Sequence, residues 1–97
     1  MKKGYWVVAY QSISDESTVK SYAALARLAL ESFGARFLTS STSQIRPHEA
    51  GLPLRTIVVE FDSYQTALAA HDSEAYQKAL QALGSGAKRD FRIVEGV

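Results

Sequence analysis

Apolar residues follow two different patterns along the chain. Residues 4–11 hold a run of aromatic and β-branched side chains, which is typical of a buried strand. Residues 19–33 instead repeat apolar side chains at helical spacing; these are Val19, Tyr22, Ala23, Ala26, Ala29, Leu30 and Phe33. We expect Ser14 to cap this helix and Gly34 to end it, because glycine readily adopts the left-handed conformation that closes helices.

The rest of the chain repeats the same order of elements. Residues 35–42 begin as a strand and end in a run of serines and threonine, and residues 43–53 form a long loop. Residues 54–62 form the clearest strand. A second helical stretch begins at Ser63, with a restart at Ser73, and the glycines at 84 and 86 stop it before a last strand at 89–95. This βαββαβ order predicts an α+β, ferredoxin-like fold, a four-stranded antiparallel sheet with two helices on one face.

The first strand is apolar on both sides. Side chains alternate along a strand, so Trp6, Val8 and Tyr10 point one way, and the set Tyr5, Val7 and Ala9 points the other. Helices on one face leave the second set uncovered, and an exposed patch of several aromatic and aliphatic side chains marks an interaction surface. We therefore expect a homodimer related by a two-fold axis.

Composition narrows the classes of function. The chain of 97 residues is 46% hydrophobic and 22% charged, so we expect one folded domain spanning residues 1–97. The absence of cysteine excludes disulfides and thiolate metal sites, and agrees with a cytoplasmic location. A net charge of +1 gives no general attraction for nucleic acid, and no apolar run is long enough to cross a membrane. RNA recognition is also disfavoured because residues 55–61 lack the paired aromatics that stack bases.

Five segments in the same order resemble a known family. They are residues 3–7 (KGYWV), 34–38 (GARFL), 58–64 (VVEFDSY), 73–77 (SEAYQ) and 93–96 (IVEG). Together they are similar to the domain-of-unknown-function family numbered thirteen-thirty. The resemblance implies a subunit of the dimeric α+β barrel superfamily, in which two sheets face each other. That superfamily includes cofactor-free oxygenases and lactone isomerases, so the fold does not fix a reaction. The sequence departs from the family pattern at residues 40–42 (SST), where the family usually shows Arg-Gly-Gly.

Glu60 and His71 are the candidates for proton transfer. Glu60 shares a strand face with Thr56 and Val58, so it points between the two sheets if the more apolar face meets the helices. The competing interpretation is an ion pair with Arg36 or Arg92 that holds the dimer. His71 could act as acid or base, or simply lie at a helix end. Its separation from the only other histidine, His48, matches no metal-ligand spacing, so we expect no metal and no cofactor.

Three further residues are candidates for binding. Trp6 could line an aromatic pocket, Arg36 could anchor an anion at its mouth, and Tyr76 could lie beside His71. The sequence thus predicts a homodimer that binds a small apolar or aromatic metabolite, between sheet and helices or between the two sheets. One alternative is a cofactor-free oxygenase or isomerase that uses Glu60 or His71. Another is a dimerisation module with no ligand.

Overall fold

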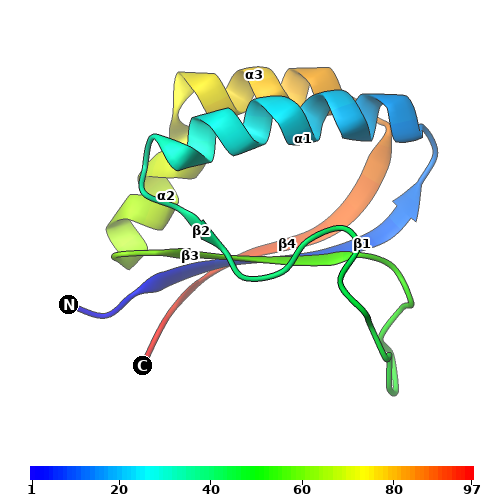
Figure 1. The fold of residues 1–97 in the computed structure, drawn as a ribbon, viewed down its shortest axis with the longest axis horizontal. Coiled ribbons are helices and arrows are strands. Elements are labelled where there is room, and N and C mark those ends of the chain that lie inside the picture. The colour runs from blue at the N-terminus through cyan, green and yellow to red at the C-terminus, as the bar shows by residue number, and fades with distance from the viewer.

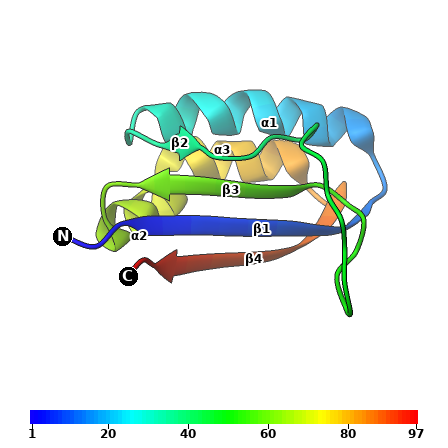
Figure 2. The same ribbon diagram turned by 60° about the horizontal axis from the view of Figure 1, so that its bottom comes forward.

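The computed structural model describes all residues from 1 to 97 and shows helices covering one face of a sheet (Figure 1). The strands are β1 (Gly4–Ile13), β2 (Arg36–Phe37), β3 (Thr56–Phe61) and β4 (Ala87–Glu95), and the helices are α1 (Glu16–Glu31), α2 (Tyr64–Asp72) and α3 (Glu74–Leu83). All strand pairs are antiparallel, in the order β2-β3-β1-β4 (Figure 2). The ferredoxin-like prediction is confirmed.

The helix boundaries follow from capping residues. Asp15, not Ser14, caps α1, because its carboxylate accepts hydrogen bonds from the amides of Ser17 and Thr18. Ser14 instead donates its hydroxyl to the carbonyl of Ser85, at 3.2 Å. Gly34 closes the helix with a φ of 72° in the left-handed region, as expected.

The second helical stretch is two helices, so three helices lie on the sheet instead of two. Ser73 separates them with an extended ψ of 149°, which ends α2 and starts α3. Its hydroxyl donates to the carbonyl of Ala70 and accepts from the amide of Tyr76. The predicted restart at Ser73 is therefore a real break.

The core lies between the helices and one face of the sheet. Trp6, Val8 and Tyr10 of β1 are buried there, together with Val59 and Phe61 of β3. Trp6 lies at its centre, 1% exposed, and its indole N–H donates to the carbonyl of Ala67 at 2.9 Å. The other set of β1, with Tyr5, Val7 and Ala9, is only partly buried, as the alternation predicts.

Gly4 shows why the first strand begins as it does. A Cβ atom there would lie 2.6 Å from the backbone of Ser63 and Tyr64, closer than any side chain tolerates. Only glycine lets the start of β1 pass the start of α2 this closely. The two termini lie side by side at one end of the sheet (Figure 2).

Candidate functional site

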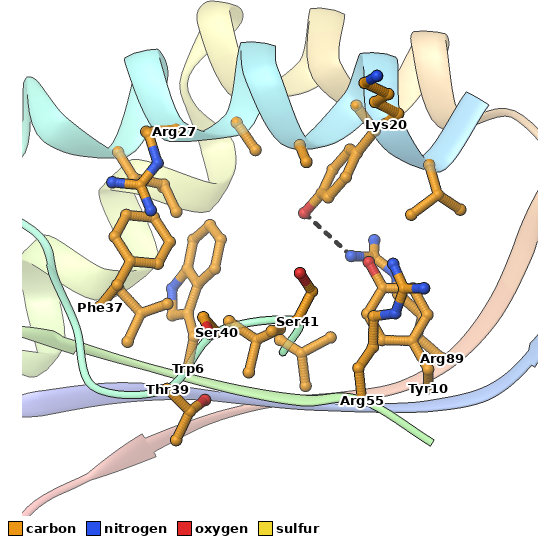
Figure 3. Close-up of a pocket in the computed structure, with 18 of the residues that line it drawn as sticks. Trp6, Tyr10, Lys20, Arg27, Phe37, Thr39, Ser40, Ser41, Arg55 and Arg89 are labelled. Atoms are coloured by element: carbon orange, nitrogen blue, oxygen red, sulfur yellow. Dashed lines mark hydrogen bonds between the residues drawn. The ribbon is translucent and has the colours of Figure 1, made fainter. Parts of the chain in front are cut away.

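A pocket of about 440 Å³ lies between the sheet and α1 (Figure 3). Eleven of its nineteen lining residues are hydrophobic. The sheet contributes Trp6, Val8, Tyr10, Ile57 and Val59, and α1 contributes Val19, Tyr22, Ala23, Ala26 and Leu30. Its size falls within the range of roughly 300–1,000 Å³ that small-molecule sites occupy.

The pocket exists because small side chains face each other across it. On α1, Ala26 is buried and Ala23 lies at the exposed edge, and both line the pocket with a single methyl group where a leucine would fill the space. On the sheet, Val8 and Ile57 present short aliphatic side chains opposite them. The gap between helix and sheet is therefore left partly open along α1.

Thr39 holds the outer wall of the pocket in place after β2 ends. Its hydroxyl donates to the carbonyl of Thr56 at 2.7 Å and accepts from the amide of Val58 at 2.9 Å. One side chain thus satisfies both strand groups that a longer β2 would have paired. The backbone then turns away, and Thr39, Ser40 and Ser41 border the pocket (Figure 3).

Four cationic side chains line this apolar pocket. They are Lys20, Arg27, Arg55 and Arg89, against the single carboxylate of Glu16. The lining therefore carries a net charge of +3, in a chain whose net charge is +1. Arg55 and Glu16 neutralise each other through an ion pair of 2.9 Å. The unpaired charge at the pocket is positive.

Two tyrosine hydroxyls join Arg89 in a chain of hydrogen bonds. Nη1 of Arg89 donates to the hydroxyl of Tyr22 at 2.9 Å, drawn as the dashed line in Figure 3. The hydroxyls of Tyr22 and Tyr76 lie 2.7 Å apart. Burial raises the pKa of Tyr76 well above its usual range, and burial also raises the pKa of Tyr10. The phenols of Tyr76 and Tyr10 are therefore neutral at physiological pH.

Neither Tyr76 nor His71 lines the pocket: Tyr76 lies in the aromatic core, and His71, with its side chain 35% exposed, lies at the edge of that core. Tyr76 is fully buried, and its ring packs edge-on against Trp6 with centroids 4.9 Å apart. The ring of His71 contacts Trp6, Tyr76 and Phe91, with centroids 5.4 to 6.1 Å away. Its Nδ1 lies 3.1 Å from the carboxylate of Asp72. The interpretation of His71 as a residue near a helix end agrees with this position.

Glu60 and Arg36 lie on the opposite face of the sheet. Nε of Arg36 donates to Glu60 at 2.8 Å, and the hydroxyl of Tyr5 donates to the other carboxylate oxygen at 2.9 Å. The hydrogen bond from Arg36, followed by that from Tyr5, lowers the pKa of Glu60. The predicted ion pair between Glu60 and Arg36 is confirmed.

The five predicted site residues do not meet in one pocket. Trp6 lines the pocket, Tyr76 and His71 lie outside it, and Glu60 and Arg36 lie across the sheet. The expectation that all five line or gate one pocket is wrong, because Glu60 and Arg36 extend from the face of the sheet opposite to Trp6. Nor does any group of three or more acidic or histidine side chains form a metal-binding cluster.

Sequence reasoning missed Arg89. It alternates with Phe91 and Ile93 along β4, and these two apolar residues pack against the core. That alternation was the available signal, because a strand that turns apolar side chains inward turns every second residue inward with them. An arginine on an inward face is unusual enough to suggest a binding role.

The protein-family comparison identifies the chain. Residues 3–97 match the family described as "Domain of unknown function (DUF1330)". The chain belongs to the DUF1330 family. No curated protein matches it in sequence.

Solved structures share the DUF1330 fold seen here. A protein of unknown function from Rhodopseudomonas palustris, RPA0582, superposes with a TM-score of 0.76 at 8% identity, over 99% of this chain and 83% of that one. A candidate antibiotic biosynthesis monooxygenase from Nitrosomonas europaea gives 0.59 at 15% identity, over 99% and 90%. A Bacteroides thetaiotaomicron protein of unknown function, described as a possible oxidoreductase, gives 0.57 at 12%, over 97% and 95%.

At these identities the likeness shows the fold alone. The neighbours share the ferredoxin-like fold of this chain, in agreement with the fold that the sequence predicts. The same fold carries unrelated activities, so function must be argued from the residues of this chain.

No helix is both long and apolar enough to cross a bilayer.

Proposed function

We propose that this protein binds a small apolar or aromatic molecule in the pocket between the sheet and α1. The observation that carries the proposal is the pocket itself, about 440 Å³ with a mainly hydrophobic lining. Trp6, Tyr10 and Phe37 supply aromatic surface, and Ala23 and Ala26 leave the space. Burying an apolar ligand surface there is favourable at roughly 25 cal/mol per Å².

Catalysis by proton transfer has less support from the geometry. An oxygenase or isomerase without cofactor would use Glu60 or His71, and a candidate monooxygenase shares the fold. Neither residue lines the pocket, and Glu60 is held as an ionised carboxylate by Arg36. A carboxylate whose pKa is lowered is a weak base. Binding is therefore the function that this arrangement supports better.

Filling the pocket tests the proposal. Ala26→Leu adds a larger side chain at a buried position that lines the pocket, and Ala24→Leu is the matched control at an exposed position of the same helix. The probe is 2-naphthamide, which is neutral and aromatic. Binding is followed by the NMR signal of the Trp6 indole N–H, which is unique because the chain has one tryptophan.

We expect 2-naphthamide to shift the Trp6 signal of the unsubstituted protein and of Ala24→Leu. The Ala26→Leu variant should bind at least about tenfold more weakly, because the loss of buried contact corresponds to more than about 1.4 kcal/mol. A Trp6 signal that never moves, or equal binding by both variants, would contradict the proposal. An unmoved signal together with a dimeric mass would favour a dimerisation module with no ligand.

We also propose that the protein is a homodimer joined through its open sheet face, the surface of Tyr5, Val7, Ala9, Leu38, Val58 and Val94. Leu38 and Val94 are 54% and 45% exposed in the single chain. The arginines on this face are already paired, Arg36 with Glu60 and Arg92 with Asp90. A copy placed over the face therefore leaves neither arginine unpaired, and a two-fold axis sets this patch against itself.

The long loop supports the same arrangement. Residues 43–53 project beyond the sheet on the side away from the helices (Figure 1). They carry Ile45 and Leu52, which are 38% and 49% exposed. Light scattering should give a mass of twice 10.6 kDa. A monomer at micromolar concentration would contradict the dimer.

A further inference from the structure

Arg89 is an inward-facing cation with no carboxylate partner. Its guanidinium lies over three aromatic rings, 4.7 Å from the centroid of Tyr22, 5.3 Å from Phe91 and 5.6 Å from Tyr10. Nη1 donates to the hydroxyl of Tyr22, and the hydroxyls of Tyr76 and Tyr10 are further acceptors beside it. A guanidinium carries five N–H donors, so donors remain for another acceptor.

Three of the other five arginines are paired with carboxylates. Arg36, Arg55 and Arg92 each form an ion pair of 3.0 Å or less with a carboxylate. Arg27 lies over the ring of Phe37 at the pocket edge, 4.6 Å from its centroid. Arg89 and Arg27 thus line the pocket without a carboxylate.

The neighbouring phenols do not neutralise Arg89. Arginine can only donate, so the hydroxyl of Tyr22 accepts from it. Burial raises the pKa of Tyr76 and of Tyr10, so neither supplies a phenolate as counter-ion. The aromatic rings stabilise the cation, but a carboxylate brought by a ligand would give it the counter-ion that the pocket does not supply.

We propose that the ligand of this pocket is a carboxylic acid with an apolar or aromatic body, and that Arg89 binds its carboxylate. This rests on the proposed binding function and adds the chemical class of the ligand. The planar fork of a guanidinium fits the two oxygens of a carboxylate, and such charge-assisted hydrogen bonds are stronger than neutral ones. The hydroxyl of Tyr22 holds the fork in place, and the apolar body lies against Trp6, Val8 and Ala26.

The experiment compares matched acids and amides on the folded chain of 97 residues. The probes are three pairs, benzoate and benzamide, 2-naphthoate and 2-naphthamide, and hexanoate and hexanamide. The two members of each pair have nearly the same shape and differ in charge. Affinities are measured from the Trp6 indole signal for the unsubstituted protein, Arg89→Gln, Arg89→Lys and Arg92→Gln. Arg92 is the control, because it lies on the same strand but is exposed and pairs with Asp90.

We expect at least one acid to bind about ten- to a hundredfold more tightly than its amide, as charged hydrogen bonds of roughly 1.5–3 kcal/mol predict. Arg89→Gln should reduce the acid to the affinity of the amide and leave the amide unchanged. Arg89→Lys keeps the charge but loses the planar fork, so its affinity for the acid should lie between the affinities of the unsubstituted protein and of Arg89→Gln. This variant also tests the proposal if Arg89→Gln does not fold. Arg92→Gln should change neither the affinity for the acid nor the affinity for the amide.

Two results would overturn the inference in distinguishable ways. Acids and amides that bind equally, or a preference that survives both substitutions of Arg89, would remove the carboxylate class and leave the binding function standing. Failure of every probe to shift the Trp6 signal would remove the binding function itself, and the inference with it.

Discussion

Two hydrogen bonds determine the chemistry of Glu60 in this structure. The carboxylate accepts from Nε of Arg36 at 2.8 Å and from the hydroxyl of Tyr5 at 2.9 Å. Both favour the charged form, so they lower the pKa of Glu60. The same carboxylate raises the pKa of Tyr5, chiefly through their hydrogen bond. A residue that looked like a general base in the sequence is a fixed anion on the sheet.

The lowered pKa of Glu60 predicts a contribution to acid sensitivity. Because the folded pKa lies below the usual value of about 4.3, the stabilisation from Glu60 is complete above that pH and is lost as pH falls through the folded pKa. Glu60→Gln should therefore be less stable than the unsubstituted protein at neutral pH, and the difference in unfolding free energy should close as pH falls through the folded pKa. Urea unfolding at a series of pH values from neutral to acidic gives the unfolding free energy of both proteins as a function of pH.

Asp15 titrates in the same region and must be separated from Glu60. Hydrogen bonds from Ser17 and Thr18 lower the pKa of Asp15, so the unsubstituted protein loses stability in acid for two reasons. The difference between the two proteins isolates Glu60, and Glu31→Gln on α1 serves as a control at an exposed carboxylate. Curves for Glu60→Gln that run parallel to the unsubstituted protein at every pH would contradict the prediction.

At the scale of elements, the short β2 shapes the site. Only Arg36 and Phe37 form strand pairs with β3, and the sequence pattern predicted a longer element from residue 35. The serines after Leu38 favour turns, so the backbone leaves the sheet there. The side chain of Thr39 replaces the missing strand pairing, and the residues after it are free to border the pocket.

Thr39→Val tests that replacement. Valine has nearly the same shape but no hydroxyl, so the carbonyl of Thr56 and the amide of Val58 both lose their partner. We expect a loss of about 1–3 kcal/mol in unfolding free energy, as for a partly buried group left unsatisfied. Thermal or urea unfolding measures it, and Thr42→Val in the exposed loop is the control. Equal stability of the two variants would contradict the role given to Thr39.

At the scale of the whole molecule, the pocket and the open sheet face lie on opposite sides of the sheet. The pocket uses the inward side chains Val8 and Val59, and the open face uses Val7 and Val58 beside them. The proposed dimer contact therefore does not cover the pocket. Ligand binding and dimerisation should be separable by substitution.

Val58→Lys places a charge at the centre of the open face. We expect it to shift the mass from twice 10.6 kDa to 10.6 kDa, because a buried unpaired charge is strongly unfavourable in an interface. Binding of 2-naphthamide should persist. Leu28→Lys, on an exposed position of α1, controls for the added charge. A dimer that survives Val58→Lys would contradict the proposed interface.

The sequence by itself determined the order of elements, the alternation of each strand and most helix ends. Ser73 signalled the break between α2 and α3, and Gly34 the end of α1, because capping depends on a few neighbouring residues. The two-sided β1 was also readable, since its alternation is a local property. The order of elements predicted the ferredoxin-like fold, the family resemblance agreed with it, and the structure confirms it.

Only the tertiary structure decided which side chains meet. Glu60 and His71 were both candidates for proton transfer in the sequence, yet neither lines the pocket, and Arg89 of the last strand meets Tyr22 of the first helix there. The pocket arises where alanines on α1 and short side chains on the sheet leave space, so it depends on the distance between these two elements. Local patterns set the direction of each side chain, whereas the spacing between helix and sheet depends on packing across the whole core.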